Sequence, residues 1–173
     1  MKVSKIILVP GNGVGWENLD NKVWYGWLKR TVEAQLHVPE RPSWMPFILN
    51  DLACDADTII VGHSSGAACA LRLLEKTRVR GVFLVSAYTS DLGYATERAS
   101  GYFNRPFQWA TMKSNTDFVV QFHGEDDHLV PLAEGELVAQ ELGTEFRVIE
   151  GGGHFQQGTF EQLFEAIRNK IQP

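Results

Sequence analysis

The stretch that most constrains the fold of this chain spans residues 58–76, where three local patterns follow one another without a break. The β-branched run at residues 58–61 is typical of a buried strand. The Ala- and Leu-rich run at residues 67–74 is typical of a helix. Between them, Gly62-His63-Ser64-Ser65-Gly66 forms a G-x-S-x-G pattern. A strand that turns at once into a helix strains the central residue and lifts the Ser64 hydroxyl clear of the sheet.

The residues around Ser64 suit such a nucleophile elbow. Glycines are needed at 62 and 66, because side chains at Gly62 and Gly66 would collide across so tight a turn. The start of a helix leaves N–H groups without partners, and that of Ser65 can stabilise an oxyanion. The alternative is a glycine-flanked turn that merely contains serines, since the pattern is short enough to occur by chance. The strand before it and the helix after it favour the elbow.

The rest of the chain alternates between strand-like and helix-like segments. This order predicts a mostly parallel sheet that is covered by helices on both faces, a three-layer αβα sandwich. No repeat, low-complexity run or linker divides the chain, so we expect a single domain over residues 1–173. Besides residues 58–61, the predicted strands are 3–9, 79–85, 118–122 and 146–149, with 36–38 as a further short candidate. The predicted helices are 24–36, 44–52, 67–74, an acidic helix to about residue 142, and 160–171.

Composition narrows the classes of function. Lys and Arg number 16 against 21 Asp and Glu, a net charge of −5, so we expect no nucleic-acid partner. The N-terminal apolar run is too brief for a signal peptide, and no segment approaches the length of a membrane span. Cys54 and Cys69 are interpreted as a reduced, buried pair. A cytoplasmic protein without a membrane partner is therefore expected.

A glycine-rich loop, Pro10-Gly11-Asn12-Gly13-Val14-Gly15, follows the first predicted strand, and two interpretations compete for it. A phosphate-binding loop would need G-x-G-x-x-G or Gly-Lys-Ser/Thr. The third glycine comes too early for the first pattern, and the second is absent. The other interpretation is an oxyanion loop, which supplies a backbone N–H beside Ser64. We prefer it, and expect the N–H of Asn12 to be the second oxyanion donor.

Polar residues with complementary chemistry follow three of the predicted strands: Ser64, the pair Asp126-Asp127, and His154. The carboxyl ends of parallel strands meet at one edge of a sheet, and the order Ser, Asp, His is that of α/β-hydrolases. The imidazole of His154 would take the serine proton and return it to the leaving group, and a carboxylate would fix the imidazole tautomer.

The choice between Asp126 and Asp127 depends on local pattern. Gly124-x-x-Asp127-x-x-Val130-Pro131 is the arrangement that we expect around the acid, because the proline-started helix fixes the loop. We therefore favour Asp127. Asp126 would then cap the helix start or form hydrogen bonds within the loop.

Metal binding has no support in the sequence. The spacing of His63, His123 and His128 matches no motif such as H-E-x-x-H, and no Cys pair joins them. Structural or pocket-lining roles are favoured for these histidines, and no metal or cofactor is expected.

The aromatic, irregular segment at residues 97–109 has two interpretations. Core packing is the default for its aromatic side chains. Because the segment also contains Gly101 and Pro106, it is equally a candidate for a small lid or pocket wall.

Segments along nearly the whole chain carry a family resemblance. They are Pro10-Gly11-Asn12-Gly13, Trp24-Tyr25-Gly26-Trp27, Gly62-His63-Ser64-Ser65-Gly66, Ser86-Ala87-Tyr88-Thr89-Ser90-Asp91-Leu92-Gly93, Glu97-Arg98-Ala99-Ser100-Gly101-Tyr102-Phe103 and Gly153-His154-Phe155-Gln156. On these segments the chain resembles the retinoblastoma-binding protein 9 family of small cytosolic serine hydrolases. The resemblance implies a six-stranded α/β-hydrolase with little or no cap and a Ser64, Asp127, His154 triad. It also implies hydrolysis of small esters, amino-acid esters or short peptides.

The chain departs from this family at the motif that gives it its name. The family's Leu-x-Cys-x-Glu motif binds the retinoblastoma pocket, but here Leu52-x-Cys54 is followed by Ala56 in place of Glu. The lost carboxylate predicts no tight binding of this kind.

Three functions remain in order of preference. The first is a serine hydrolase that cleaves small ester or amide substrates through an acyl-enzyme. The second is a serine aminopeptidase-like enzyme, which a pocket carboxylate would favour because its substrates carry a free amine. The third is a protein-interaction module on a hydrolase scaffold with residual activity.

Overall fold

The computed structural model describes residues 5–12, 23–32, 36–37 and 44–171. The strands are β1 (Lys5–Val9), β2 (Leu36–His37), β3 (Thr58–His63), β4 (Val79–Val85), β5 (Thr116–Gly124) and β6 (Glu145–Ile149). The helices are α1 (Tyr25–Thr31), α2 (Trp44–Pro46), the π-helix η2 (Phe47–Asp51), α3 (Ser65–Leu74), α4 (Ala95–Ser100), α5 (Trp109–Ser114), α6 (Leu132–Leu142) and α7 (Glu161–Ile171). None of the helices within these ranges is long and apolar enough to cross a membrane.

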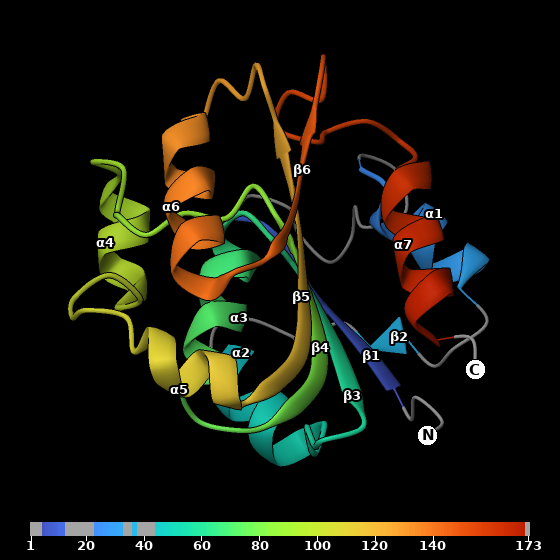
Figure 1. Cartoon of the computed structure of the whole chain (residues 1–173), viewed down its shortest axis with the longest axis vertical. Helices are drawn as coiled ribbons and strands as arrows, with labels where there is room; N and C mark the ends of the chain where they lie inside the picture. The colour runs from blue at the N-terminus through green and yellow to red at the C-terminus, as the bar shows by residue number, and fades with distance from the viewer. Residues whose placement is uncertain (1–4, 13–22, 33–35, 38–43, 172–173) are drawn as a thin grey trace.

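The strands form one sheet in the order β2-β1-β3-β4-β5-β6, and every pairing is parallel. Helices α1 and α7 cover one face, whereas α2, α3 and α6 cover the other (Figure 1). The prediction of a parallel α/β fold is therefore confirmed.

Alternating side chains of the central strands divide the core into two apolar layers. In β1, Ile6 and Leu8 pack with α1 and α7, whereas Ile7 and Val9 pack with α2 and α3. All four side chains are fully buried. Because successive residues of a strand point to opposite faces, a strand in the middle of the sandwich buries side chains on both faces and is apolar over most of its length. This burial holds the carboxyl ends of the central strands, and the loops that follow them, in fixed positions.

Two helix predictions need correction. The helix predicted over residues 24–36 ends at Thr31, because Val32 is extended with ψ of 122°. Leu36–His37 instead pairs with β1 as β2, in agreement with the short strand candidate at 36–38, and residues 33–35 and 38 lie outside the described residues. The helix predicted over residues 44–52 begins as α2 but continues as a π-helix, in which the N–H of Leu52 donates to the carbonyl of Phe47 at 2.9 Å.

Other predictions fall partly on residues that the structure does not describe. These are the start of the first strand at residues 3–4 and the glycines at positions 13 and 15 of the predicted oxyanion loop. The remaining strand predictions agree with β3 to β6 within a few residues, and residues 79–85 match β4 at both ends.

Candidate active site

Ser64 occupies the turn between β3 and α3. Its backbone lies at φ 55° and ψ −121°, a conformation that a residue with a side chain adopts only under strain. Backbone hydrogen bonds hold this turn from both sides. The N–H of Ser64 donates to the carbonyl of Val85 at 2.9 Å, and the carbonyl of Ser64 accepts from the N–H of Ala67 at 2.8 Å. The local geometry is that of a strand–turn–helix elbow.

Gly62 and Gly66 lie where the backbone leaves no room for a side chain. A Cβ on Gly62 would lie 2.6 Å from the carbonyl oxygen of Gly66. A Cβ on Gly66 would lie 2.0 Å from the carbonyl oxygen of Val9 in β1. The first close approach is the collision across the turn that the sequence suggests, whereas the second shows that the start of α3 also packs directly on the neighbouring strand.

Asp127 and His154 meet at the carboxyl ends of β5 and β6. The ring Nδ1 of His154 lies 2.9 Å from Oδ2 and 3.0 Å from Oδ1 of Asp127. The Ser86 hydroxyl donates to Oδ2 at 2.7 Å, and the N–H groups of Leu129 and Val130 donate to Oδ1 at 3.0 Å each. Burial opposes ionisation of this carboxyl, but the hydrogen bonds outweigh it and lower the pKa of Asp127 to about 2.

Asp126 has a different partner. Its Oδ1 accepts the backbone N–H of Gly153 at 2.8 Å, so this side chain ties the loop that carries His154 to the end of β5. Gly124 lies at the same junction, where a Cβ would approach the carbonyl oxygen of Gly153 to 2.1 Å. Asp127 is thus the aspartate that contacts the imidazole, and Asp126 forms the loop hydrogen bond considered as its alternative role.

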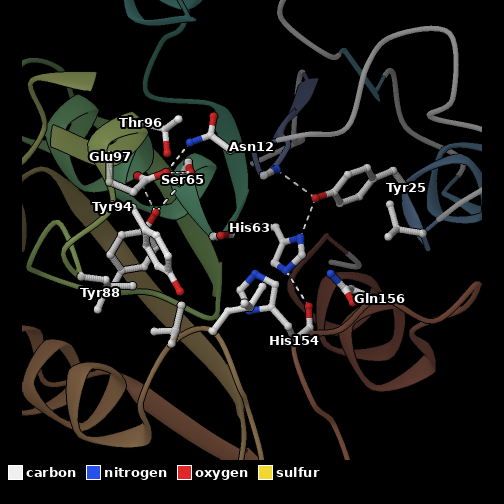
Figure 2. A pocket seen from close by; sticks show the side chains of 16 residues that line it. Asn12, Tyr25, His63, Ser65, Tyr88, Tyr94, Thr96, Glu97, His154 and Gln156 are labelled. Carbon is white, nitrogen blue, oxygen red and sulfur yellow. Dashed lines mark hydrogen bonds between the residues drawn. The ribbon is translucent and has the colours of Figure 1, made fainter. Parts of the chain in front are cut away.

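Ser64, Ser65, His154 and Asn12 line one cavity of about 270 Å³ (Figure 2). Asp127 lies behind His154 and does not line it. Within the described part of the chain, Ser64 and His154 share this cavity without a hydrogen bond between their side chains. A Cβ on Gly11 would lie 3.2 Å from that of Ser64, so the predicted oxyanion loop lies against the elbow.

A chain of hydrogen bonds crosses one side of the cavity (Figure 2). The N–H of Gly11 donates to the Tyr25 hydroxyl at 2.9 Å, and that hydroxyl lies 2.5 Å from Nδ1 of His63. Nε2 of His63 lies 3.0 Å from the backbone carbonyl oxygen of His154. The pKa of His63 is lowered to about 3, mainly by burial and to a smaller extent by the nearby His154. This ring is therefore neutral at ordinary pH.

A second network surrounds the buried carboxylate of Glu97 on the other side of the cavity (Figure 2). Its Oε1 accepts the Ser65 hydroxyl at 2.7 Å and the side-chain amide of Asn12, and its Oε2 accepts the Tyr88 hydroxyl at 2.6 Å. Burial and the bond to Glu97 raise the pKa of Tyr88. One carboxylate therefore contacts both residues that were predicted to supply oxyanion donors.

Sequence reasoning did not find Tyr25, Ser86 or Glu97 as site residues. Ser86 had a usable signal, because it directly follows a predicted strand at the edge where catalytic groups gather. Tyr25 had none, since its partner His63 lies 38 residues away in the chain. For Glu97 the signal was limited to the pocket-wall interpretation of residues 97–109, which does not identify its partner Ser65, 32 residues away. Contacts of this kind become visible only when the sheet order is known.

The aromatic segment at residues 97–109 divides between the two interpretations. Glu97 alone of the segment lines the cavity, together with Tyr94 and Thr96 just before it. Of its aromatic side chains, Tyr102, Phe107 and Trp109 lie against the core layer formed with α3, whereas Phe103 stacks on Tyr88, which itself lines the cavity. Core packing therefore accounts for the aromatic residues, and the pocket-wall interpretation holds only at Glu97.

His63 and His123 both make hydrogen bonds within the protein. Nε2 of His63 and Nε2 of His123 each lie 3.0 Å from a backbone carbonyl oxygen, that of His154 and that of Val130. Within the described ranges, no group of three or more His, Cys, Asp or Glu side chains is arranged to hold a metal ion. Cys54 and Cys69 are both free thiols, Cys69 fully buried and Cys54 half-buried.

A parallel α/β sheet with a strained serine at a strand–helix turn defines the class of α/β-hydrolases, and comparison with known proteins agrees. The family described as serine hydrolase matches residues 6–170, and the chain belongs to this family. Serine hydrolase RBBP9 of Rattus norvegicus is 40% identical over 182 residues, which cover 98% of this chain and 97% of that protein.

Solved structures share the fold. The ydeN gene product of B. subtilis superposes with a TM-score of 0.84 at 19% identity, over 98% of each chain. An esterase from Rhodococcus sp. ECU1013 superposes with a TM-score of 0.66 at 14% identity, over 97% of this chain and 90% of that one. At these identities the likeness establishes the architecture, whereas the family match establishes a serine hydrolase.

Proposed function

We propose that this serine hydrolase cleaves small ester or amide substrates through an acyl-enzyme, with Ser64 as nucleophile, His154 as general base and acid, and Asp127 as the carboxylate that orients His154. The N–H groups of Ser65 and Asn12 are the proposed oxyanion donors. No metal or cofactor takes part in this chemistry.

The proposed reaction has two halves. Ser64 Oγ attacks the substrate carbonyl carbon while Nε2 of His154 takes its proton, and the carbonyl oxygen becomes an oxyanion held by the two N–H groups. The intermediate collapses, the bond to the leaving group breaks, and His154 returns the proton to that group. Water then attacks the acyl-enzyme by the same route and releases the acid and free Ser64.

The contact between His154 and Asp127 is the observation that carries this proposal. An ionised Asp127 can only accept, so it keeps the proton of the neutral imidazole on Nδ1. Nε2 is then left with a lone pair, which is the state that a general base needs. The other two supporting observations are the strained φ of Ser64 and the cavity that Ser64 and His154 share.

The covalent intermediate provides the test. The protein is mixed with p-nitrophenyl acetate, quenched in acid and weighed by intact-protein mass spectrometry. We expect wild-type protein to gain one acetyl group on the peptide that contains Ser64, with a burst of p-nitrophenol. Ser64→Ala should show neither. An acetyl group on another residue, or turnover that survives in Ser64→Ala, would contradict the proposed mechanism.

Glu97 favours the second candidate, an aminopeptidase-like enzyme on amino-acid esters or short peptides. Its carboxylate is 5% exposed and lines the cavity beside Ser65, where it can accept the ammonium group of a substrate. Rates on a phenylalanine ester and on the matched phenylpropionate ester, which lacks only the amine, test this candidate. We expect Glu97→Gln to lower the ratio of the rate on the phenylalanine ester to the rate on the phenylpropionate ester. An unchanged ratio would contradict recognition of the amine by Glu97 and favour the simple esterase.

The remaining expectations belong to the same proposal. We infer a single domain over residues 1–173 that contains a six-stranded sheet with little or no cap, located in the cytoplasm, with neither nucleic acid nor membrane as partner.

Leu52 and Cys54 are half-buried and pack against the core, and Ala56 stands where the family motif has Glu, so no tight retinoblastoma-pocket binding is proposed. A pull-down that depends on Leu52 and Cys54 would overturn this. Binding of any partner that survives Ser64→Ala would favour the interaction-module alternative.

A further inference from the structure

The loop that carries His154 has positive φ on both sides of this residue, and the conformation is strained at Phe155. Gly153 and Phe155 both have φ of 50°, and Phe155 is not a glycine. Phe155 is fully buried and stacks on Phe160 with ring centroids 4.6 Å apart, and its N–H donates to the carbonyl of Gly152 at 3.1 Å. Strained conformations persist only where the surroundings fix them. Contacts from the rest of the fold must therefore hold the peptide group that joins His154 to Phe155.

The carbonyl of that same peptide group is the acceptor for His63. A carbonyl oxygen can only accept, so Nε2 of His63 carries the proton. In a neutral ring Nδ1 is then an acceptor, and the Tyr25 hydroxyl must donate to it. The Tyr25 oxygen in turn accepts the N–H of Gly11. The direction of every bond in the chain is thus determined, and one protonation state satisfies all of them.

We infer that His63, oriented by Tyr25, is a positioning residue for the hydrolase reaction: it fixes the backbone of His154 relative to the Gly11–Asn12 loop, so that the imidazole and the proposed oxyanion donors keep one spacing. This inference rests on the proposed function of Ser64 and His154. His63 itself does not exchange a proton with the substrate. It acts through the His154 carbonyl, 3.0 Å from its Nε2, while the Tyr25 hydroxyl connects it to the loop beside Ser64.

Two substitutions at position 63 distinguish the hydrogen bond from His63 to the His154 carbonyl from the hydrogen bond between His63 and Tyr25. The amide nitrogen of Gln lies near the position of Nε2 in histidine, so His63→Gln keeps a donor for the His154 carbonyl. The amide of Asn lies near the position of Nδ1, so His63→Asn keeps a partner for Tyr25 but leaves the carbonyl without its donor. We expect His63→Asn to lower kcat about 10²-fold, because small displacements of catalytic groups cost that much. We expect His63→Gln to recover at least about tenfold of this loss, with KM within about threefold of wild type in both.

A hydroxyl deletion on α1 gives a matched control. Tyr25→Phe removes the oxygen that bridges Gly11 and His63, and should lower kcat in the same way as His63→Asn. Thr31→Val also removes one hydroxyl from α1, but that hydroxyl donates to the carbonyl of Trp27 within the same helix at 2.7 Å, and kcat should be unchanged. Thermal unfolding of each variant identifies any that fail to fold. Equal kcat in His63→Asn and His63→Gln, or losses that appear in KM alone, would overturn the inference.

NMR of the imidazole nitrogens shows which ring nitrogen of His63 carries the proton, and it needs no substrate turnover. It therefore distinguishes failure of this inference from failure of the proposed chemistry. Signals of His63 are assigned by their absence in His63→Gln. We expect the neutral tautomer with its proton on Nε2, persisting well below the usual histidine pKa of about 6.5. A proton on Nδ1, or a ring that titrates near that value, would show that the chain of bonds does not exist even if Ser64 proves to be the nucleophile.

Discussion

Gly66 and Val9 approach each other so closely that no side chain fits between them: a Cβ on Gly66 would lie 2.0 Å from the Val9 carbonyl oxygen. The backbone at Gly66 and the backbone at Val9 are both held in the core, so neither can move aside without a large cost in free energy. We expect Gly66→Ala to lower the free energy of unfolding by about 3 kcal/mol or more. Urea denaturation measures this change. Gly158→Ala is the control, since a Cβ there meets no atom of the described residues within 4 Å; equal stability of the two variants would contradict the close packing of elbow on strand.

The two neighbouring aspartates should differ sharply in their effect on catalysis. Asp127→Asn removes the charge that stabilises the imidazolium and offers Nδ1 the wrong hydrogen-bonding group, so kcat should fall about 10⁴-fold. Asp126→Asn keeps an oxygen that can accept the N–H of Gly153, and kcat should change by less than about tenfold. Ester hydrolysis by both variants decides the matter. A larger loss in Asp126→Asn would reverse the assignment of the acid.

Asp127 should also contribute to stability in a pH-dependent way. Its pKa in the folded protein is about 2, below the value of about 3.9 in an unfolded chain. A group whose pKa is lower in the folded state stabilises the fold above its unfolded pKa, and this contribution is lost as the pH falls toward the folded value. Between about pH 5 and about pH 2, wild-type protein should therefore lose more unfolding free energy than Asp127→Asn. Parallel losses in the two proteins would mean that Asp127 titrates normally.

The segment after α4 should behave as a fixed part of the fold, since Arg72 of α3 holds it. The Arg72 guanidinium is buried and donates to the carbonyls of Tyr102 at 2.7 Å, Arg105 at 2.5 Å and Pro106 at 3.1 Å. It also lies 3.7 Å from the ring centroid of Phe107.

Limited proteolysis tests this attachment. We expect residues 97–109 to resist cleavage equally with and without a covalent inhibitor on Ser64, and Arg72→Met to make the segment sensitive. Arg78→Met is the control, because its half-exposed side chain contacts Asp117 and the carbonyl of Ser114, outside this segment. Protection that appears only with the inhibitor would indicate a moving lid.

The sequence predicted the parts of the molecule whose signals are local. Residues 79–85 are rich in Val, Phe and Leu, and the strand predicted there matches β4 at both ends, while the G-x-S-x-G pattern predicts the turn at Ser64. The helix predicted to residue 36 was wrong at its end because pairing of Leu36 with Ile6 favours a strand over the helical spacing. Here a long-range contact overrides local propensity.

The candidate site shows the same division. Ser64, Asp127 and His154 could be proposed from chain order and from their places after strands. The Glu97 carboxylate and the bonds from Tyr25 to His63 could not, because each joins residues from different elements of the sheet and its helices. Buried polar networks depend on which side chains the fold brings together, and no spacing along the chain encodes that.

Labelling by a fluorophosphonate probe tests the central claim most directly, because the probe reacts only with a serine that a neighbouring base activates. Native wild-type protein and Ser64→Ala are treated side by side and resolved by gel fluorescence, with heat-denatured wild type as a control for unspecific reaction. The account predicts strong labelling of native wild type and none of Ser64→Ala or of denatured protein. Equal labelling of wild type and Ser64→Ala, or an unlabelled native wild type, would contradict the claim that Ser64 is an activated nucleophile.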